Sequence, residues 1–199
     1  MSKMSSRDKL RRMTGLSIFS AVIVVLTILC TFVRFGPFSI TLALAPIVIG
    51  AALYGSSGGA LLGFVFSAVV LFTGIMGWDG GTIMLLMSQN WLACILVCLA
   101  KGTLAGWTAG LIYNLVSAKS VDLGVICAAI ISPIVNTGIF ILGMLLFFMS
   151  TLESWAGGQA VVYFIIVGLT GINFLVELAV NIVLSSGISR IIRTVKKEH

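Results

Sequence analysis

Ile172-Asn173-Phe174-Leu175-Val176-Glu177-Leu178-Ala179-Val180-Asn181 is the stretch that decides the fold, and it lies inside a long apolar run near the C-terminus. If this run is helical, Asn173, Glu177 and Asn181 fall at a spacing of four and share one face. A carboxylate at membrane depth is costly unless it is paired or faces water. We therefore expect this face to point into the protein, where other helices supply its polar partners.

The composition indicates a helical membrane protein. Of 199 residues, 59% are hydrophobic and only 9% are charged, whereas soluble domains carry about 25% charged residues. A membrane-spanning helix needs roughly 20 apolar residues, so the chain has room for five or six such helices in one domain. We expect an all-α bundle over residues 1–199.

The net charge of +6 comes mainly from the two ends of the chain. The positive-inside rule therefore predicts a basic cytoplasmic segment at residues 1–12 and a cytoplasmic tail at residues 193–199. Two cytoplasmic ends require an even number of crossings, which favours six helices over five. Nucleic-acid binding is disfavoured because the charges flank membrane spans and lack interleaved aromatic residues.

The apolar runs predict six helices, which alternate in direction. The segments 54–58 and 117–122 are expected inside, and the segments 34–39, 77–90 and 150–159 outside. Pro46 is expected to kink the short second helix. The predicted helices are residues 13–33, 40–53, 59–76, 91–116, 123–149 and 160–192.

Polar residues of the last three predicted helices are expected near the middle of the membrane. At a rise of about 1.5 Å per residue, Lys101 lies ~15 Å deep, Asn136 and Asn173 ~20 Å, and Glu177 ~25 Å. Lys101 and Glu177 either form a structural ion pair or line a wet cavity together with the amides. Asn181 lies nearer the inside and is interpreted as structural.

The predicted outside segments carry a second set of candidates. Arg34 can bind an anion bidentately or contact a lipid headgroup. Asn90 and Trp91 stand where the fourth helix begins. Trp91, together with Trp78 and Trp155, forms either an interfacial aromatic belt or a wall over a ligand.

Motifs for catalysis are missing. The sequence has no Gly-x-x-x-x-Gly-Lys-Ser/Thr motif for ATP, and no His-Glu-x-x-His or Ser/His/Asp arrangement. The cysteines lie in apolar runs and are interpreted as small buried hydrophobic residues rather than metal or redox groups. We therefore expect neither an enzyme, nor a cofactor, nor a metal site.

Several motifs together resemble a known family. Gly36-Pro37-Phe38-Ser39-Ile40-Thr41-Leu42 leads into Pro46-Ile47-Val48-Ile49-Gly50-Ala51-Ala52-Leu53-Tyr54-Gly55. With six helices and both ends inside, the pattern resembles the substrate-binding S component of energy-coupling-factor (ECF) vitamin transporters, over most of the chain. The other matching features are Gly59, Gly63, Lys101-Gly102-Thr103 with the glycine stripe Gly102, Gly106 and Gly110, and Pro133-Ile134-Val135-Asn136-Thr137-Gly138.

The resemblance implies a protein of the bacterial plasma membrane that captures a vitamin from outside. It implies docking on a transmembrane T subunit that two ATPase subunits drive. A small-xxx-small surface on the first helix contacts the T subunit in that family, and Ser17 and Ala21 match its spacing. The implied pocket residues are Arg34, Asn90, Trp91, Lys101, Asn136 and Asn173, with Glu177 deeper than the usual site.

Two basic groups, Arg34 and Lys101, suit a ligand that carries a carboxylate. A pantothenate-type ligand fits best, while folate, riboflavin and other vitamins remain open. A self-sufficient proton-coupled carrier that uses Glu177 is the main alternative function. A scaffold or enzyme subunit without transport activity is a third, supported only by helix-packing features.

Overall fold

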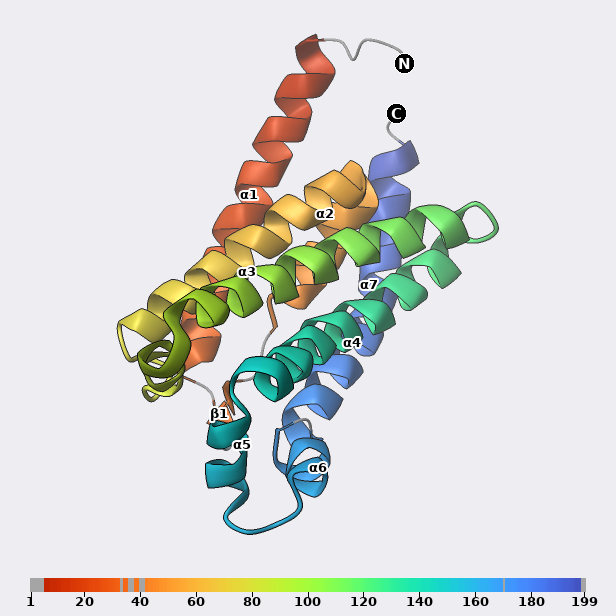
Figure 1. The fold of residues 1–199 in the computed structure, drawn as a ribbon. Helices are drawn as coiled ribbons and strands as arrows, with labels where there is room; N and C mark the ends of the chain where they lie inside the picture. The colour runs from red at the N-terminus through yellow and green to blue at the C-terminus, as the bar shows by residue number, and fades with distance from the viewer. Residues whose placement is uncertain (1–5, 33, 36–37, 40–41, 170, 198–199) are drawn as a thin grey trace.

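The computed structural model describes residues 6–32, 34–35, 38–39, 42–169 and 171–197, which form a helical bundle (Figure 1). Within these residues, α1 to α4 are long and apolar enough to cross a membrane. The all-α prediction is confirmed, apart from a two-residue antiparallel pair, β1 (Arg34–Phe35) with β2 (Phe38–Ser39). The helices are α1 (Ser6–Thr31), α2 (Leu44–Ile75), α3 (Thr82–Ser117), α4 (Val121–Phe147), α5 (Met149–Ala156), α6 (Val161–Phe164), the π-helix η1 (Ile165–Leu169) and α7 (Gly171–Lys197).

The first helix packs along α2. Arg12 Nη2 donates to Tyr54 O at 3.3 Å and to Ser57 Oγ at 2.7 Å. Phe19 meets the Tyr54 ring edge-on, with 6.2 Å between centroids. Gly15 gives room for the same tyrosine, because a Cβ there would overlap the Tyr54 hydroxyl. These contacts fasten the N-terminal half of α1 to the bend of α2.

Gly55 bends α2 into two halves. Its backbone is non-helical, with φ 76° and ψ −177°, a region that glycine enters without steric cost. The halves fold back on each other, since a Cβ at Gly50 would overlap the side chain of Leu62. The turn predicted at 54–58 is thus a single residue.

The predicted kink at Pro46 is wrong. The helix begins at Leu44, so Pro46 lies in its first turn, where the missing backbone N–H has no intrahelical partner to lose. The first half of α2, up to Gly55, is only ~16 Å long at 1.5 Å per residue, about half of a bilayer core.

Glycines bring the second half of α2 into backbone contact with α3. A Cβ at Gly59 would overlap Gly106 O, and a Cβ at Gly63 would overlap Gly102 O. The two four-residue glycine repeats therefore face each other. Small residues let membrane helices approach this closely, so that van der Waals packing stabilises the pair.

Asn90 interrupts α3. Its φ of −152° and ψ of 90° are non-helical, and its Oδ1 accepts a hydrogen bond from Ala93 N at 3.0 Å. The asparagine thus acts as an N-cap for the long part of α3, which begins at Trp91 as predicted. The short helical segment before Asn90 lies in the connection that was expected outside.

The last part of the chain differs from the continuous helix predicted over 160–192. The region instead contains α6, the π-helix η1 and α7. In addition, α5 occupies most of the predicted loop at 150–159 and ends at Gly157 in the left-handed conformation, with φ 57°. A π-turn widens the hydrogen-bond ladder locally, which apolar periodicity does not reveal.

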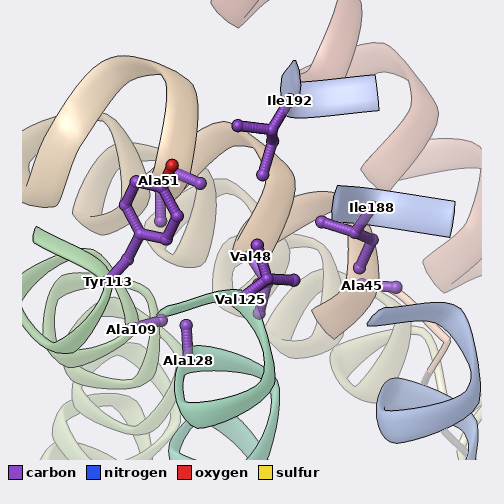
Figure 2. Close-up of a cluster of buried hydrophobic side chains, with 10 residues drawn as sticks. Ala45, Val48, Ala51, Ala109, Tyr113, Val125, Ala128, Ile188 and Ile192 are labelled. Carbon is purple, nitrogen blue, oxygen red and sulfur yellow. The ribbon is translucent and has the colours of Figure 1, made fainter. Parts of the chain in front are cut away.

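The N-terminal end of α1 and the C-terminal end of α7 lie at the same end of the bundle, opposite α5 and α6 (Figure 1). Near the terminal end, four helices share a buried cluster (Figure 2). Its members include Val48 and Ala51 of α2, Ala109 and Tyr113 of α3, Val125 and Ala128 of α4, and Ile188 and Ile192 of α7.

Candidate functional site

Buried polar side chains line one face of α7. Glu177 is 6% exposed and Asn181 is fully buried. Ser185 and Ser189 continue the spacing of four and are also buried. Because α4 packs against α7, this polar face is directed into the protein rather than toward lipid, as the sequence predicted for Glu177 and Asn181.

Ser185 and Ser189 were missed by the sequence analysis, although the same spacing predicts them. The Asn181 side chain serves the helix itself, because Nδ2 donates to Glu177 O at 2.8 Å. Its Oδ1 is buried and accepts no hydrogen bond from the described residues.

A second polar face belongs to α4. Asn136 is 7% exposed, and Ser132, one turn before it, is fully buried. Asn136 Oδ1 and Ser132 Oγ have no hydrogen-bond partner among the described residues. Leaving a buried polar group unpaired costs about 1–3 kcal/mol, so such groups gain from a bound solute or from water.

Lys101 reaches this region from α3. Its Nζ lies 5.2 Å from the centroid of the Phe140 ring, and Phe140 follows Asn136 by one helical turn on α4. Lys101 is half-buried and lies ~15 Å along the helix from Trp91. The structure therefore brings Lys101 and Asn136 to neighbouring levels of the α3–α4 interface.

Phe140 is the residue of this contact that the sequence analysis missed. An aromatic residue inside an apolar run carries no signal that distinguishes a cation partner from a packing residue. A structural pairing of Lys101 with Glu177 stays a prediction. The contact observed for the Lys101 ammonium group is the Phe140 ring.

The other predicted site residues do not join Lys101 and Asn136 in the described part of the structure. Asn90 is exposed and caps α3. Trp91 is 62% exposed, so its ring lies on the outside of the bundle. Arg34 belongs to β1 and Asn173 to α7, but both side chains lie outside the described part of the structure.

The three tryptophans of the predicted outside segments have different surroundings, since Trp91 is largely exposed. Trp78 packs on Phe32, the residue that follows α1, with 6.0 Å between ring centroids. Trp155 packs against the apolar cluster of α3, α4 and α5. Gln89 Oε1, near Trp91, accepts a hydrogen bond from Thr151 Oγ1 at 2.7 Å, which ties the start of α3 to α5.

Two of the four cysteines have a packing role. Cys94 and Cys98 are buried in that same apolar cluster, and all four cysteines are free thiols. Among the described residues, no cluster of histidine, cysteine and acidic side chains has the arrangement of a metal site.

The predicted docking pair is accessible. Ser17 and Ala21 are both exposed on α1, and the Ser17 hydroxyl is satisfied within the helix by Met13 O at 3.0 Å. Their neighbours Ile18 and Val25 are 59% and 56% exposed. The helix α1 therefore exposes a largely apolar face that includes these two small residues.

A comparison with known protein families matches residues 11–189 to the family described as "ECF transporter, substrate-specific component". The matched range begins in α1, includes Ser17 and Ala21, and ends in α7 at Ser189. No curated protein sequence matches the chain.

Proposed function

Because the chain belongs to the family of ECF transporter substrate-specific components, we propose that it captures a vitamin or related micronutrient outside the cell. It then delivers the solute through a T subunit and two ATPase subunits. The family is one of transporter subunits, in agreement with the absence of catalytic motifs from the sequence.

The Lys101 ammonium group carries the proposal for the site. A lysine in the middle of apolar helices is expensive and marks a functional site by default. Lys101 is half-buried, contacts an aromatic ring, and lies near Asn136, whose Oδ1 has no partner among the described residues. A negatively charged solute with hydrogen-bonding groups complements both, and pantothenate is our best candidate.

The remaining predicted site residues complete the proposal. In the proposed solute site, the outer mouth contains Arg34, Asn90 and Trp91. The wall that α7 contributes contains Asn173 and Glu177. Asn90 keeps its amide Nδ2 for the solute, because only Oδ1 serves as the cap. Trp91, exposed at the outside, contacts the solute only during entry.

We also propose six crossings, with both ends in the bacterial cytoplasm. The exposed residues Arg7, Lys9 and Arg11 belong to the first turns of α1, and the exposed Arg190 belongs to the C-terminal part of α7. These two helix ends lie at the terminal end of the bundle (Figure 1). The opposite end carries Glu153 on α5. This asymmetry supports the orientation by the positive-inside rule.

Lys101→Met tests the proposed site. The purified chain is expected to be stabilised by pantothenate in a thermal-shift panel of B vitamins. Because a hydrogen bond to a charged group contributes about 1.5–3 kcal/mol, Lys101→Met should weaken binding by roughly ten- to a hundredfold. Isothermal titration calorimetry measures this loss, with Lys119→Met in the exposed α3–α4 turn as the control.

Native mass spectrometry of the gently purified chain would detect a co-purified small molecule that the vitamin panel does not contain. Wild-type chain that binds no vitamin in the panel and carries no small molecule would contradict the proposed function. Unchanged affinity in Lys101→Met would remove this lysine from the site while leaving the function in place.

The buried Glu177 favours the proton-coupled carrier as the second candidate function. As an S component, the lone chain in liposomes should not accumulate solute when a pH gradient is applied. A carrier would accumulate it, and Glu177→Gln would abolish that uptake while Glu153→Gln, exposed on α5, would not. Gradient-driven uptake with this pattern would replace our proposal.

A further inference from the structure

The contact between Lys101 and Phe140 carries an inference that rests on the proposed function and deepens it. We infer that Phe140 is a positioning residue, which holds the Lys101 ammonium group where the negative group of the solute binds. Nζ lies 5.2 Å from the ring centroid, within the ~6 Å over which a ring face attracts a cation.

A ring face suits this task better than a carboxylate does. An acidic partner would neutralise the lysine and compete with an anionic solute. The ring quadrupole stabilises the cation but has no net charge. The ammonium group therefore keeps its attraction for an anion, and its donors that point away from the ring are available to a solute carboxylate.

Phe140 also reduces the freedom of a long side chain. An immobilised lysine loses much of its rotamer freedom, and this loss opposes binding. Because the ring already restrains Nζ in the free protein, binding of the solute costs less side-chain entropy. This pre-organisation raises the affinity.

The position of Asn136 extends the inference to the class of solute. Asn136 and Phe140 are four residues apart on α4 and so share one face, with ~6 Å between their levels. Asn136 Oδ1 accepts no bond from the described residues. The site is thus matched to a small carboxylate that carries a hydroxyl or amide donor about one helical turn from its charge.

Phe140→Leu tests the inference with two ligands that differ in charge. We expect it to weaken the binding of pantothenate by about fivefold to thirtyfold, the equivalent of the ~1–2 kcal/mol of a partly desolvated cation–π contact. Binding of pantothenol, its neutral alcohol analogue, should change less than twofold. Phe140→Tyr keeps a ring face and should restore pantothenate binding, while Phe147→Leu, on an exposed residue of the same helix, controls for the lost volume.

A second readout needs no ligand. Acetylation of Lys101 by acetic anhydride, followed by peptide mass spectrometry, reports how strongly the charged amine is held, with Lys119 as the internal reference. Labelling of Lys101 should rise several-fold in Phe140→Leu and return to the wild-type rate in Phe140→Tyr. Equal labelling in all three proteins, or equal losses for pantothenate and pantothenol, would overturn the inference.

The two readouts separate this inference from the proposed function. If Lys101 labelling responds to Phe140 but no vitamin binds the wild-type chain, the function fails and the contact stands. If a vitamin binds and labelling does not respond, the function stands and Phe140 is only a packing residue.

Discussion

Gly106→Ala should lower the melting temperature of the purified protein by roughly 2–12 °C. A Cβ at Gly106 would overlap Gly59 O, and a backbone carbonyl inside a helix cannot move aside as a side chain can. The methyl group therefore forces α2 and α3 apart along their whole contact. Overpacking costs about 1–3 kcal/mol, and each kcal/mol shifts the melting temperature by about 2–4 °C in a chain of this size.

Gly187→Ala is the matched control for this substitution. It adds the same methyl group to a helical glycine of α7, and no atom lies within 4 Å of the new Cβ. Thermal unfolding in detergent, followed by fluorescence size-exclusion chromatography, should show an unchanged or slightly raised melting temperature. A Gly106→Ala protein as stable as the wild type would mean that α2 and α3 do not approach as closely as described.

Ala21→Trp should abolish uptake by the assembled transporter while leaving solute binding by the isolated chain intact. Ala21 and Ser17 are exposed on α1, away from the polar faces of α4 and α7. A tryptophan there would hold a docked helix several ångströms away, and close packing between small residues is the main attraction that such helices have. Pantothenate uptake by vesicles that contain the T subunit and both ATPases measures the first effect.

Calorimetry on the isolated variant measures the second effect. Leu115→Trp serves as the control, because Leu115 is 71% exposed but lies on α3, and it should leave uptake unchanged. Normal uptake by Ala21→Trp would remove this pair from the docking surface. Lost binding would show instead that α1 supports the solute site.

Much of the candidate site could be predicted because charge in a membrane is costly. Lys101 and Glu177 stand out in apolar runs, and helical spacing alone predicts which face of α7 is polar. The partners of these residues could not be predicted in the same way. Phe140 looks like any other apolar residue of α4, and only the packing of α3 against α4 gives it the Lys101 ammonium group as a neighbour.

Asn90 illustrates a different difficulty. An asparagine between two apolar runs suits a binding pocket and a helix cap equally well, because its amide group offers both an acceptor and a donor. The structure assigns the oxygen to Ala93 N. Similarly, nothing in the apolar pattern near Ile165 predicts that the last helix is interrupted by a π-turn.

By itself, the sequence determined that this is a helical membrane protein, that its basic residues gather at its ends, and that Glu177 must face inward. These properties follow from transfer free energies, which depend on residue type and helical spacing alone. The tertiary structure decided which glycine repeat meets which, where α2 turns back, and that an aromatic ring contacts the half-buried Lys101. Such pairings depend on contacts between helices far apart in the chain, and the local pattern of apolar and polar residues is the same for many alternative pairings.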